Sequence, residues 1–425
     1  MRAGTWEGQI AHNIEDDGID HKDGPSKHAR PALYSPPLRR SEMRILYGVV
    51  GEGMGHATRS RVLLEHLLTL GHTVRVVVSG RAHGFLTARF QGRDRIRFEE
   101  ISGLVLGFEG NAVDKSQTFW RNLEALPEGV LKNIAVYRRV AEDGFTPELV
   151  ISDFESFAHL YALNHRLPLI SIDNMQVLNR CAHDEEVRGD FGSGFQLAQK
   201  LVKLKLPGAY HYLVTSFFFP KVRKPRTTLV PPILRPEILT ALREPGEHVL
   251  VYQTAASNQA LVDALSALPF NFRVYGLGRE GRIGNVELKA FSEVGFVDDL
   301  RTARAVIAGG GFSLMGEAVN LRVPMLSLPI TGQYEQVLNG RYLERLGYGV
   351  CLESFQPDGV VDFLSRTDDF AQNLSRYEPQ DNRLVLGCLD ELIERRARGE
   401  HRPDRLDAPA MGKWLDPKLA EGELI

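Results

Sequence analysis

The feature that most constrains this chain is a repeated alternation of buried-strand and amphipathic-helix patterns. Arg44–Val50 (RILYGVV) is an uninterrupted apolar run, residues 56–70 carry apolar side chains at helical spacing, and Thr73–Ser79 (TVRVVVS) is again strand-like. The same order returns between residues 149 and 172. Such alternation predicts βαβ units, and therefore a parallel sheet with helices on its faces.

A second series of the same kind follows a proline-rich segment. Phe219–Pro236 holds five prolines, and alternation resumes with a predicted strand at His248–Gln253. It continues through a strand at Ala305–Ala308 and a helix at 313–321, and ends with a helical pattern at 381–397. The sequence thus predicts an α/β protein of two Rossmann-like, doubly wound domains. Their carboxyl strand ends would face a cleft, where open sheets bind ligands.

The two ends of the chain differ from this body. Residues 1–42 are rich in charge, Pro and Gly without a periodic apolar face, so we expect a disordered extension and folded structure from Met43. Residues 399–425 also lack a sustained period and are predicted to be a loose tail. The body then divides into an N-terminal domain at 43–228 and a C-terminal domain at 229–398.

Composition excludes several classes of protein. No apolar run approaches the roughly 20 residues that span a bilayer, and a net charge of −3 argues against a basic nucleic-acid binder. The three cysteines are widely spaced without a CxxC pair, which argues against a disulfide framework or a thiolate zinc site. Together with the lack of an apolar leader, this pattern favours a reducing cytoplasm.

A glycine loop, GEGMGH, joins the first predicted strand to the first helix. Gly53 and Gly55 permit close backbone approach, and the N–H groups of the helix start favour a negative or strongly polar ligand. The loop fails the dinucleotide fingerprint, because His56 replaces a glycine and no acidic residue ends the second strand. A neutral imidazole at this position can accept a proton. The alternative is a tight turn with a capping histidine.

A second glycine loop follows the strand at Ala305–Ala308. Gly310 and Gly311 precede a helix starting near Ser313, which is a phosphate-type cradle, and Glu317 lies one turn further on. A carboxylate there can accept both hydroxyls of a ribose. After the next strand comes a run of amide and acid groups suited to sugar hydroxyls: Gln333, Glu335, Gln336 and Asn339. The alternatives are a simple turn, a solvated glutamate and a helix-capping glutamine.

These motifs, in this order, resemble GT-B glycosyltransferases, and among them the MurG-like group that acts in peptidoglycan synthesis. The resemblance covers most of residues 43–395. It implies that Phe296 and Val297 hold a uracil, that the second glycine loop with Ser313 binds the diphosphate, and that Glu317 binds the ribose. It also implies that Gln336, with Gln333 nearby, contacts the donor sugar.

In the first half, the resemblance places the loop that ends in His56 near the reaction centre. SIDNMQ matches a polar interdomain segment, with Asp173 where the family carries an acidic residue. The family has a glycine-rich donor loop where this chain has TAAS, so Ser257 is the candidate there for the donor phosphate.

The implied reaction moves a hexose-type sugar from a nucleotide diphosphate, expected to be a UDP-sugar, to an acceptor hydroxyl. No Asp-x-Asp triplet occurs and no Glu-x7-Glu pair ends at Glu317, which favours a metal-independent, inverting reaction without a further cofactor. His56, Asp153 and Asp173 compete as the base, because each follows or ends a first-half strand. Asp153 with Glu155 can instead cap the next helix.

The acceptor is less constrained. Residues 195–226 contain seven Lys/Arg and no Asp/Glu, with Lys200, Lys203 and Lys205 between apolar residues. Such a surface suits an anionic membrane or acceptor, and so a lipid-linked or polysaccharide acceptor at the inner face of a membrane. The alternative is a solvated helix followed by a core strand at Tyr212–Phe218. A UDP-sugar 2-epimerase and a non-catalytic nucleotide-sugar or polysaccharide sensor are the competing functions.

Overall fold

The structure is a computed structural model. It describes residues 42–51, 53–103, 108–109, 112–113, 115–142, 144–189, 192–253, 259–400 and 406. The predicted extension at 1–42 lies outside the described residues except for Glu42, and the predicted tail at 399–425 does so except for 399, 400 and 406. All described residues belong to the compact unit Ser41–Ile425.

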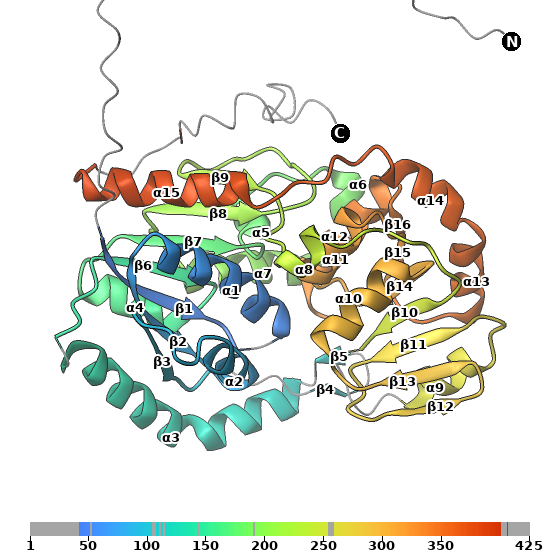
Figure 1. The fold of residues 1–425 in the computed structure, drawn as a ribbon, viewed down its shortest axis with the longest axis horizontal. Coiled ribbons are helices and arrows are strands. Elements are labelled where there is room, and N and C mark those ends of the chain that lie inside the picture. Colours follow the sequence, from blue (N-terminus) through green and yellow to red (C-terminus); the bar gives the residue numbers. More distant parts are fainter. Residues whose placement is uncertain are drawn as a thin grey trace, which may run out of the picture. The chain divides into compact units, whose positions relative to one another are not determined.

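The first half is built on a seven-stranded sheet in which every pairing is parallel (Figure 1). Its strand order is β3-β2-β1-β6-β7-β8-β9, so the order reverses at β1. The strands are β1 (Arg44–Val49), β2 (Thr73–Val78), β3 (Ile96–Glu100), β6 (Leu149–Asp153), β7 (Leu169–Asp173), β8 (His211–Thr215) and β9 (Thr227–Val230). This is the predicted doubly wound arrangement.

Helices cover both faces of this sheet, because alternate strand residues point to opposite sides. Ile45 and Tyr47 of β1 pack with one set of helices and Leu46 with the other. The first set is α1 (Met54–Thr69), α2 (Gly80–Arg89) and α15 (Arg383–Ala397); the second is α3 (Lys115–Glu142), α4 (Ser156–Asn164) and α7 (Gly192–Lys205).

The last helix corrects the predicted grouping of elements. The sequence places the 381–397 pattern in the C-terminal domain at 229–398, whereas α15 packs on the first sheet beside β8 (Figure 1). Its apolar stripe, including Leu389 and Leu392, is fully buried in the core that also contains residues of β1 and α1. The apolar stripe predicts a helix, but it does not indicate on which of the two sheets the helix packs.

The second half has its own seven-stranded sheet in the order β12-β13-β11-β10-β14-β15-β16. All its pairings are parallel except the edge pair β12–β13. The strands are β10 (Val249–Tyr252), β11 (Phe272–Tyr275), β12 (Gly281–Ile283), β13 (Val286–Lys289), β14 (Ala305–Ala308), β15 (Met325–Ser327) and β16 (Gly349–Cys351). The prediction of two α/β halves is confirmed.

The helices of this half also lie in two layers. One core joins the sheet to α9 (Gln259–Ser266), α13 (Pro357–Ser365) and α14 (Thr367–Leu374). On the other face, α10 (Glu293–Thr302), α11 (Phe312–Asn320) and α12 (Tyr334–Arg345) share a core that continues into the first half. The remaining elements are α5 (Val177–Arg180), α6 (Glu185–Arg188), α8 (Pro236–Leu239), β4 (Phe108–Glu109) and β5 (Ala112–Val113).

This architecture brings the carboxyl ends of the strands together. In the sheet register Val49 pairs with Asp153, so the first glycine loop begins beside the end of β6. The second loop follows β14 in the same way. The two loops meet, since a Cβ added to Gly55 would lie 2.5 Å from Ser313 Oγ. Within the described part of the chain, no helix is both long and apolar enough to cross a bilayer.

Candidate active site

The centre of the site is a histidine–aspartate pair. His56 lies in the first turn of α1, and Asp153 is the last residue of β6. His56 Nδ1 is 2.9 Å from Asp153 Oδ1. The Asp153 side chain is 1% exposed and that of His56 is 22% exposed, so the imidazole alone reaches solvent. His56 Nε2 has no partner among the described residues, which leaves it available to a ligand.

Arg59, one turn along α1 from His56, completes this cluster. Its Nε donates to Asp153 Oδ2 at 2.8 Å, and its Nη2 donates to Oδ1. The same Nη2 lies 2.7 Å from His56 Nδ1. Ser60 Oγ also donates to Asp153 Oδ2 at 3.2 Å, so both carboxylate oxygens are held by more than one group. A buried carboxylate needs this degree of pairing to stay ionised.

The cluster sets the charge of each member. Burial opposes ionisation of Asp153, but the charge of Arg59 and the hydrogen bonds with Arg59 and His56 outweigh it and lower the pKa of Asp153 to about 2. Burial, together with the neighbouring Arg59 guanidinium, lowers the pKa of His56 below its ordinary value, although Asp153 opposes that shift. The imidazole is therefore neutral near pH 7 and able to accept a proton.

The other two predicted carboxylates have structural partners. Asp173 Oδ2 accepts from Ser171 Oγ at 2.7 Å and Oδ1 accepts from the Gln176 N–H at 2.9 Å, with the side chain fully buried. Burial raises the pKa of Asp173 to about 6. Glu155 caps α4, accepting from the N–H groups of Phe157 and Ala158 at 2.8 and 2.7 Å. Asp153 pairs with His56 instead of joining Glu155 as a cap.

Both glycine loops present bare helix starts. Gly53 adopts a φ of 86° as the N-cap of α1, and Gly311 is the N-cap of α11; neither helix has a side-chain cap. Their first N–H groups therefore offer positive dipole ends to an anion. Gly55 allows the two halves to approach because its missing Cβ would clash with Ser313.

Side chains of α12 form hydrogen bonds with the backbone of the second glycine loop. Gln336 Oε1 accepts from the N–H groups of Gly310 and Ile330 at 3.2 and 3.0 Å, and its Nε2 donates to Gln333 Oε1 at 2.6 Å. Asn339 Nδ2 donates to the Gly310 carbonyl at 3.1 Å. A Cβ on Gly310 would lie 2.2 Å from the Gln336 carbonyl oxygen. In this arrangement Gln336 and Asn339 shape the loop.

Glu335, which precedes Gln336, is the carboxylate of this run, and its side chain is half-buried. Its Oε1 accepts from Asn339 Nδ2 at 2.9 Å. Burial raises the pKa of Glu335 to about 7, with Arg59 and Asp173 of the first half among the charges that act on it. A carboxyl group from the second half therefore stands close to the cluster of the first half.

The predicted ribose carboxylate is paired in an unexpected way. Glu317 lies in α11 and accepts from Arg235 through both oxygens, Nε to Oε1 and Nη2 to Oε2, each at 2.8 Å. The predicted base-binding residues Phe296 and Val297 lie in α10 and are buried, with the Phe296 ring against Tyr275. Ser257 lies outside the described residues.

Two members of the site, Arg59 and Arg235, were missed by the sequence reasoning. Arg59 could have been found from its i,i+3 spacing to His56 on the predicted helix. Arg235 carries no local signal, because it lies in the proline-rich connection, 82 residues before Glu317. Among the described residues, no group of three or more His, Cys, Asp or Glu side chains is placed to hold a metal.

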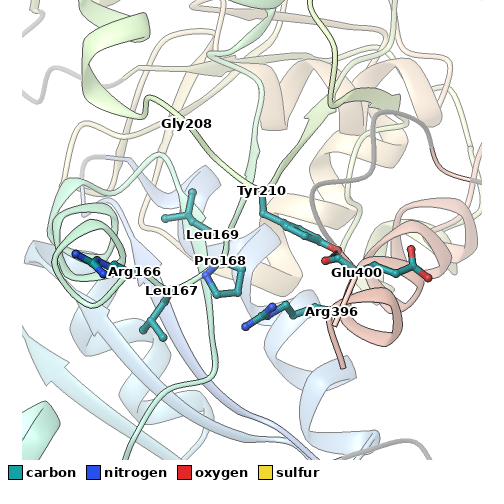
Figure 2. Close-up of a pocket in the computed structure, with 8 residues that line it drawn as sticks. All are labelled: Arg166, Leu167, Pro168, Leu169, Gly208, Tyr210, Arg396 and Glu400. Carbon is teal, nitrogen blue, oxygen red and sulfur yellow. Dashed lines mark hydrogen bonds between the residues drawn. The ribbon is translucent and has the colours of Figure 1, made fainter. Parts of the chain in front are cut away.

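Two cavities lie away from this site. One of them, of about 230 Å³, is lined by residues that include Leu169, Tyr210, Arg396 and Glu400 (Figure 2). Leu169 begins β7, so this cavity lies at the amino ends of the strands, opposite the edge that carries His56 and Asp153. We place the site by its side-chain chemistry and the topology of the sheets, because ligands of such sheets bind at the carboxyl ends.

Comparisons with known proteins agree with this geometry. The family model of glycosyl transferase family 1 matches residues 43–368. An uncharacterized glycosyltransferase of Methanosarcina acetivorans is 24% identical over 364 residues, which cover 75% of this chain and 88% of the relative. A UDP-N-acetylglucosamine--N-acetylmuramyl-(pentapeptide) pyrophosphoryl-undecaprenol N-acetylglucosamine transferase 3 of Bacillus cereus is 20% identical over 152 residues, or 32% of this chain and 43% of that protein.

A similar fold is found in a solved UDP-glucose: anthocyanidin 3-O-glucosyltransferase in complex with UDP. It is 17% identical, has a TM-score of 0.55, and the match covers 83% of this chain and 99% of that one. The two facing α/β halves are thus the GT-B fold, as the motifs predicted. The chain belongs to glycosyl transferase family 1 and is a glycosyltransferase.

Proposed function

We propose that this glycosyltransferase moves a hexose-type sugar from a UDP-sugar to an acceptor hydroxyl with inversion, using His56 as the general base and no metal. The observation that carries the proposal is the pairing of His56 Nδ1 with the buried, ionised Asp153. With Nδ1–H donating to Asp153, the unpartnered Nε2 holds the lone pair that accepts a proton.

The proposed reaction is a single displacement. As the acceptor oxygen attacks the anomeric carbon, its proton passes to His56 Nε2. The bond between that carbon and the diphosphate oxygen breaks, and its electron pair leaves with UDP. Asp153 stabilises the imidazolium that forms, and attack from the face opposite the leaving group inverts the anomeric centre. Asp173 is a weaker base candidate, because both its oxygens are engaged and its side chain is fully buried.

The second half would bind the donor. Gly310, Gly311 and Ser313 at the bare start of α11 suit the diphosphate, whose charge grows as the sugar leaves. Glu317 is proposed to hold the ribose, and Phe296 with Val297 to line the base site. The group Gln333, Glu335 and Gln336 would contact the sugar, with Gln333 and Glu335 as its half-buried members.

A panel of nucleotide sugars and nucleoside diphosphates, measured by thermal shift, tests donor binding, because a ligand that binds only the folded state raises its apparent stability. We expect UDP and at least one UDP-sugar to stabilise the protein, and UDP to be released when an acceptor is added. Conversion of a UDP-sugar to its epimer without acceptor would favour the epimerase. Binding of UDP without any turnover would favour the sensor.

We also propose that the acceptor is presented at an anionic membrane, as a lipid-linked molecule. The proposal is supported by α7, where Leu197, Leu201 and Leu204 are 58%, 57% and 72% exposed on one side of the helix. Lys200 and Lys203 are exposed beside them. Apolar side chains flanked by lysines suit the interface of an anionic bilayer.

The neighbouring helices extend this surface. Among the described residues, α3 and α4 also expose large apolar side chains, whereas α1, α2 and α15 on the opposite face of the sheet expose none. The exposed set on α3 and α4 is Val130, Leu131, Ile134, Leu160 and Leu163.

Flotation with vesicles tests the membrane proposal. We expect binding to phosphatidylglycerol-containing vesicles at low salt, with loss in Lys200→Glu/Lys203→Glu and in Leu197→Ser/Leu201→Ser. Arg398→Glu, on the opposite face, is the control and should bind as the wild type does. Recovery of the wild-type protein in the aqueous fraction would contradict membrane association and favour a polysaccharide acceptor.

A further inference from the structure

The carboxylate predicted to bind the ribose is already engaged by an arginine. Glu317 and Arg235 form a two-point ion pair at 2.8 Å through each oxygen, and the side chains are 8% and 5% exposed. Such planar pairing fixes the orientation of a carboxylate as well as its charge. It also leaves acceptor capacity, since each carboxylate oxygen has two lone-pair sites and Arg235 uses one on each.

Arg235 reaches this position from outside the two glycine loops and the helices that follow them. It precedes α8 in the segment that connects the two halves, whereas Glu317 lies inside α11. Arg235 Nη1 is also 3.8 Å from Glu293, which in turn lies 3.4 Å from Arg61 Nη1. Arg61 belongs to α1, the helix that carries His56, so a chain of charged side chains links the two halves.

The surroundings make Glu317 dependent on this partner. Burial raises the pKa of Glu317, the nearby carboxylates Glu237 and Glu293 act in the same direction, and Arg235 is the charge that opposes them. Arg61 pairs with Glu237 at 2.7 Å and so is already occupied. Without Arg235, the positive charge that opposes these effects is lost, so the pKa of Glu317 rises further.

We propose that Arg235 is a positioning residue that keeps Glu317 ionised and oriented to accept the ribose hydroxyls of the donor nucleotide. The affinity for the ribose then depends on a residue of the interdomain connection. This inference rests on the proposed function, because it presupposes that Glu317 binds a ribose.

The test compares UDP with 2′-deoxy-UDP, because the ratio of their dissociation constants reports the ribose contact and cancels general losses of affinity. In the wild-type protein we expect UDP to bind roughly 10-fold more tightly, the effect of one hydrogen bond to a charged group. In Arg235→Gln this preference should fall below about 3-fold at pH 7 and return as the pH rises to 9, since the ionised Glu317 is the acceptor.

Further variants separate positioning from a structural role. Arg235→Lys keeps the charge without the two-point geometry, so it should retain an intermediate preference without pH dependence. Glu317→Gln should lose the preference at every pH, and adding Arg235→Gln should lower it no further. Arg395→Gln is the matched control, because it breaks the 2.6 Å pair with Glu391 in α15, away from the site, and should leave the preference unchanged.

The outcomes distinguish the two proposals. A wild-type protein that binds no nucleoside diphosphate would overturn the proposed function, and this inference with it. A wild type that prefers UDP, with Arg235→Gln showing the same preference at pH 7, would overturn the positioning role alone. If Arg235→Gln does not fold, Arg235→Lys decides: an unchanged preference for UDP overturns the positioning role, and an intermediate one supports it.

Discussion

At the scale of single residues, Asp153 has the most crowded environment in the site. Its two oxygens accept from Arg59 and Ser60 and lie against His56, and the carboxylate itself is 1% exposed. The carboxylate stays ionised there because the surrounding charges outweigh its desolvation. That balance gives His56 a fixed anionic partner, which a base that becomes cationic during the reaction requires.

Replacement of Asp153 by Asn keeps the size of the side chain and removes the charge. We expect kcat to fall roughly 100- to 10,000-fold, the range of general-base effects, with a small change in the donor KM. Because the charge of Asp153 raises the pKa of His56, its loss should also move the acid limb of the pH profile to lower pH. A kcat profile between pH 5 and 8 measures both effects, and an unchanged kcat would contradict the role of Asp153.

The raised pKa of Asp173 can be tested through the pH dependence of the protein's stability. The pKa of Asp173 in the folded protein is about 6, above the ordinary value of 3.8, so the wild type is more stable at low pH, and this stabilisation is lost as the pH rises from 3.8 through 6. Between pH 4 and pH 8, the wild type should therefore lose about 2 kcal/mol of unfolding free energy relative to Asp173→Asn. Urea unfolding at both values measures this difference, and a constant difference would contradict the buried acid.

At the scale of elements, the first turn of α1 sets the distance between the halves. Gly55→Ala would bring a methyl group to 2.5 Å from Ser313 Oγ, so α1 and α11 must separate. We expect a loss of about 1–3 kcal/mol of stability and a drop in turnover.

Gly387→Ala in α15 is the control, because an added Cβ there meets nothing within 4 Å. It should stabilise the protein by about 0.5–1 kcal/mol. Equal stabilities for the two variants, by urea unfolding, would contradict the contact between the loops.

The sequence predicts individual strands and helices, but it does not predict which distant residues pair in the site. The predicted strand at Ala305–Ala308 coincides with β14, and the predicted helix at 313–321 lies within one residue of α11, because hydrophobic period and glycine turns are local signals. The predicted strand at Tyr212–Phe218 is shorter in the structure, where β8 ends at Thr215.

The site's candidates were found in the same way. Their pairing was not, because His56 and Asp153 are 97 residues apart and Arg235 and Glu317 are 82 apart. The two residues of each pair come together only through the strand order of the first sheet and the path of the segment that connects the two halves.

At the scale of the whole molecule, the last helix, α15, packs in the core of the first half. α15 follows the second half in sequence but buries Leu389 completely in the core of the first. Leu389→Ala should cost about 2–5 kcal/mol. Hydrogen exchange should speed up in β1 and β8 more than in β14, because the first sheet loses the packing. Faster exchange confined to the second sheet would contradict this assignment.

In the proposed mechanism, sugar transfer depends on both halves, since one carries the proposed base and the other the proposed donor site. The most direct measurement is the rate of UDP release from a UDP-sugar, with acceptor present, for His56→Ala and His66→Ala. His66 is a matched control on the same helix, paired with Asp390 at 2.6 Å but away from the glycine loops. We expect a loss of roughly 100-fold or more for His56→Ala alone. Near-normal release by His56→Ala, or equal losses in the two variants, would rule out His56 as the base.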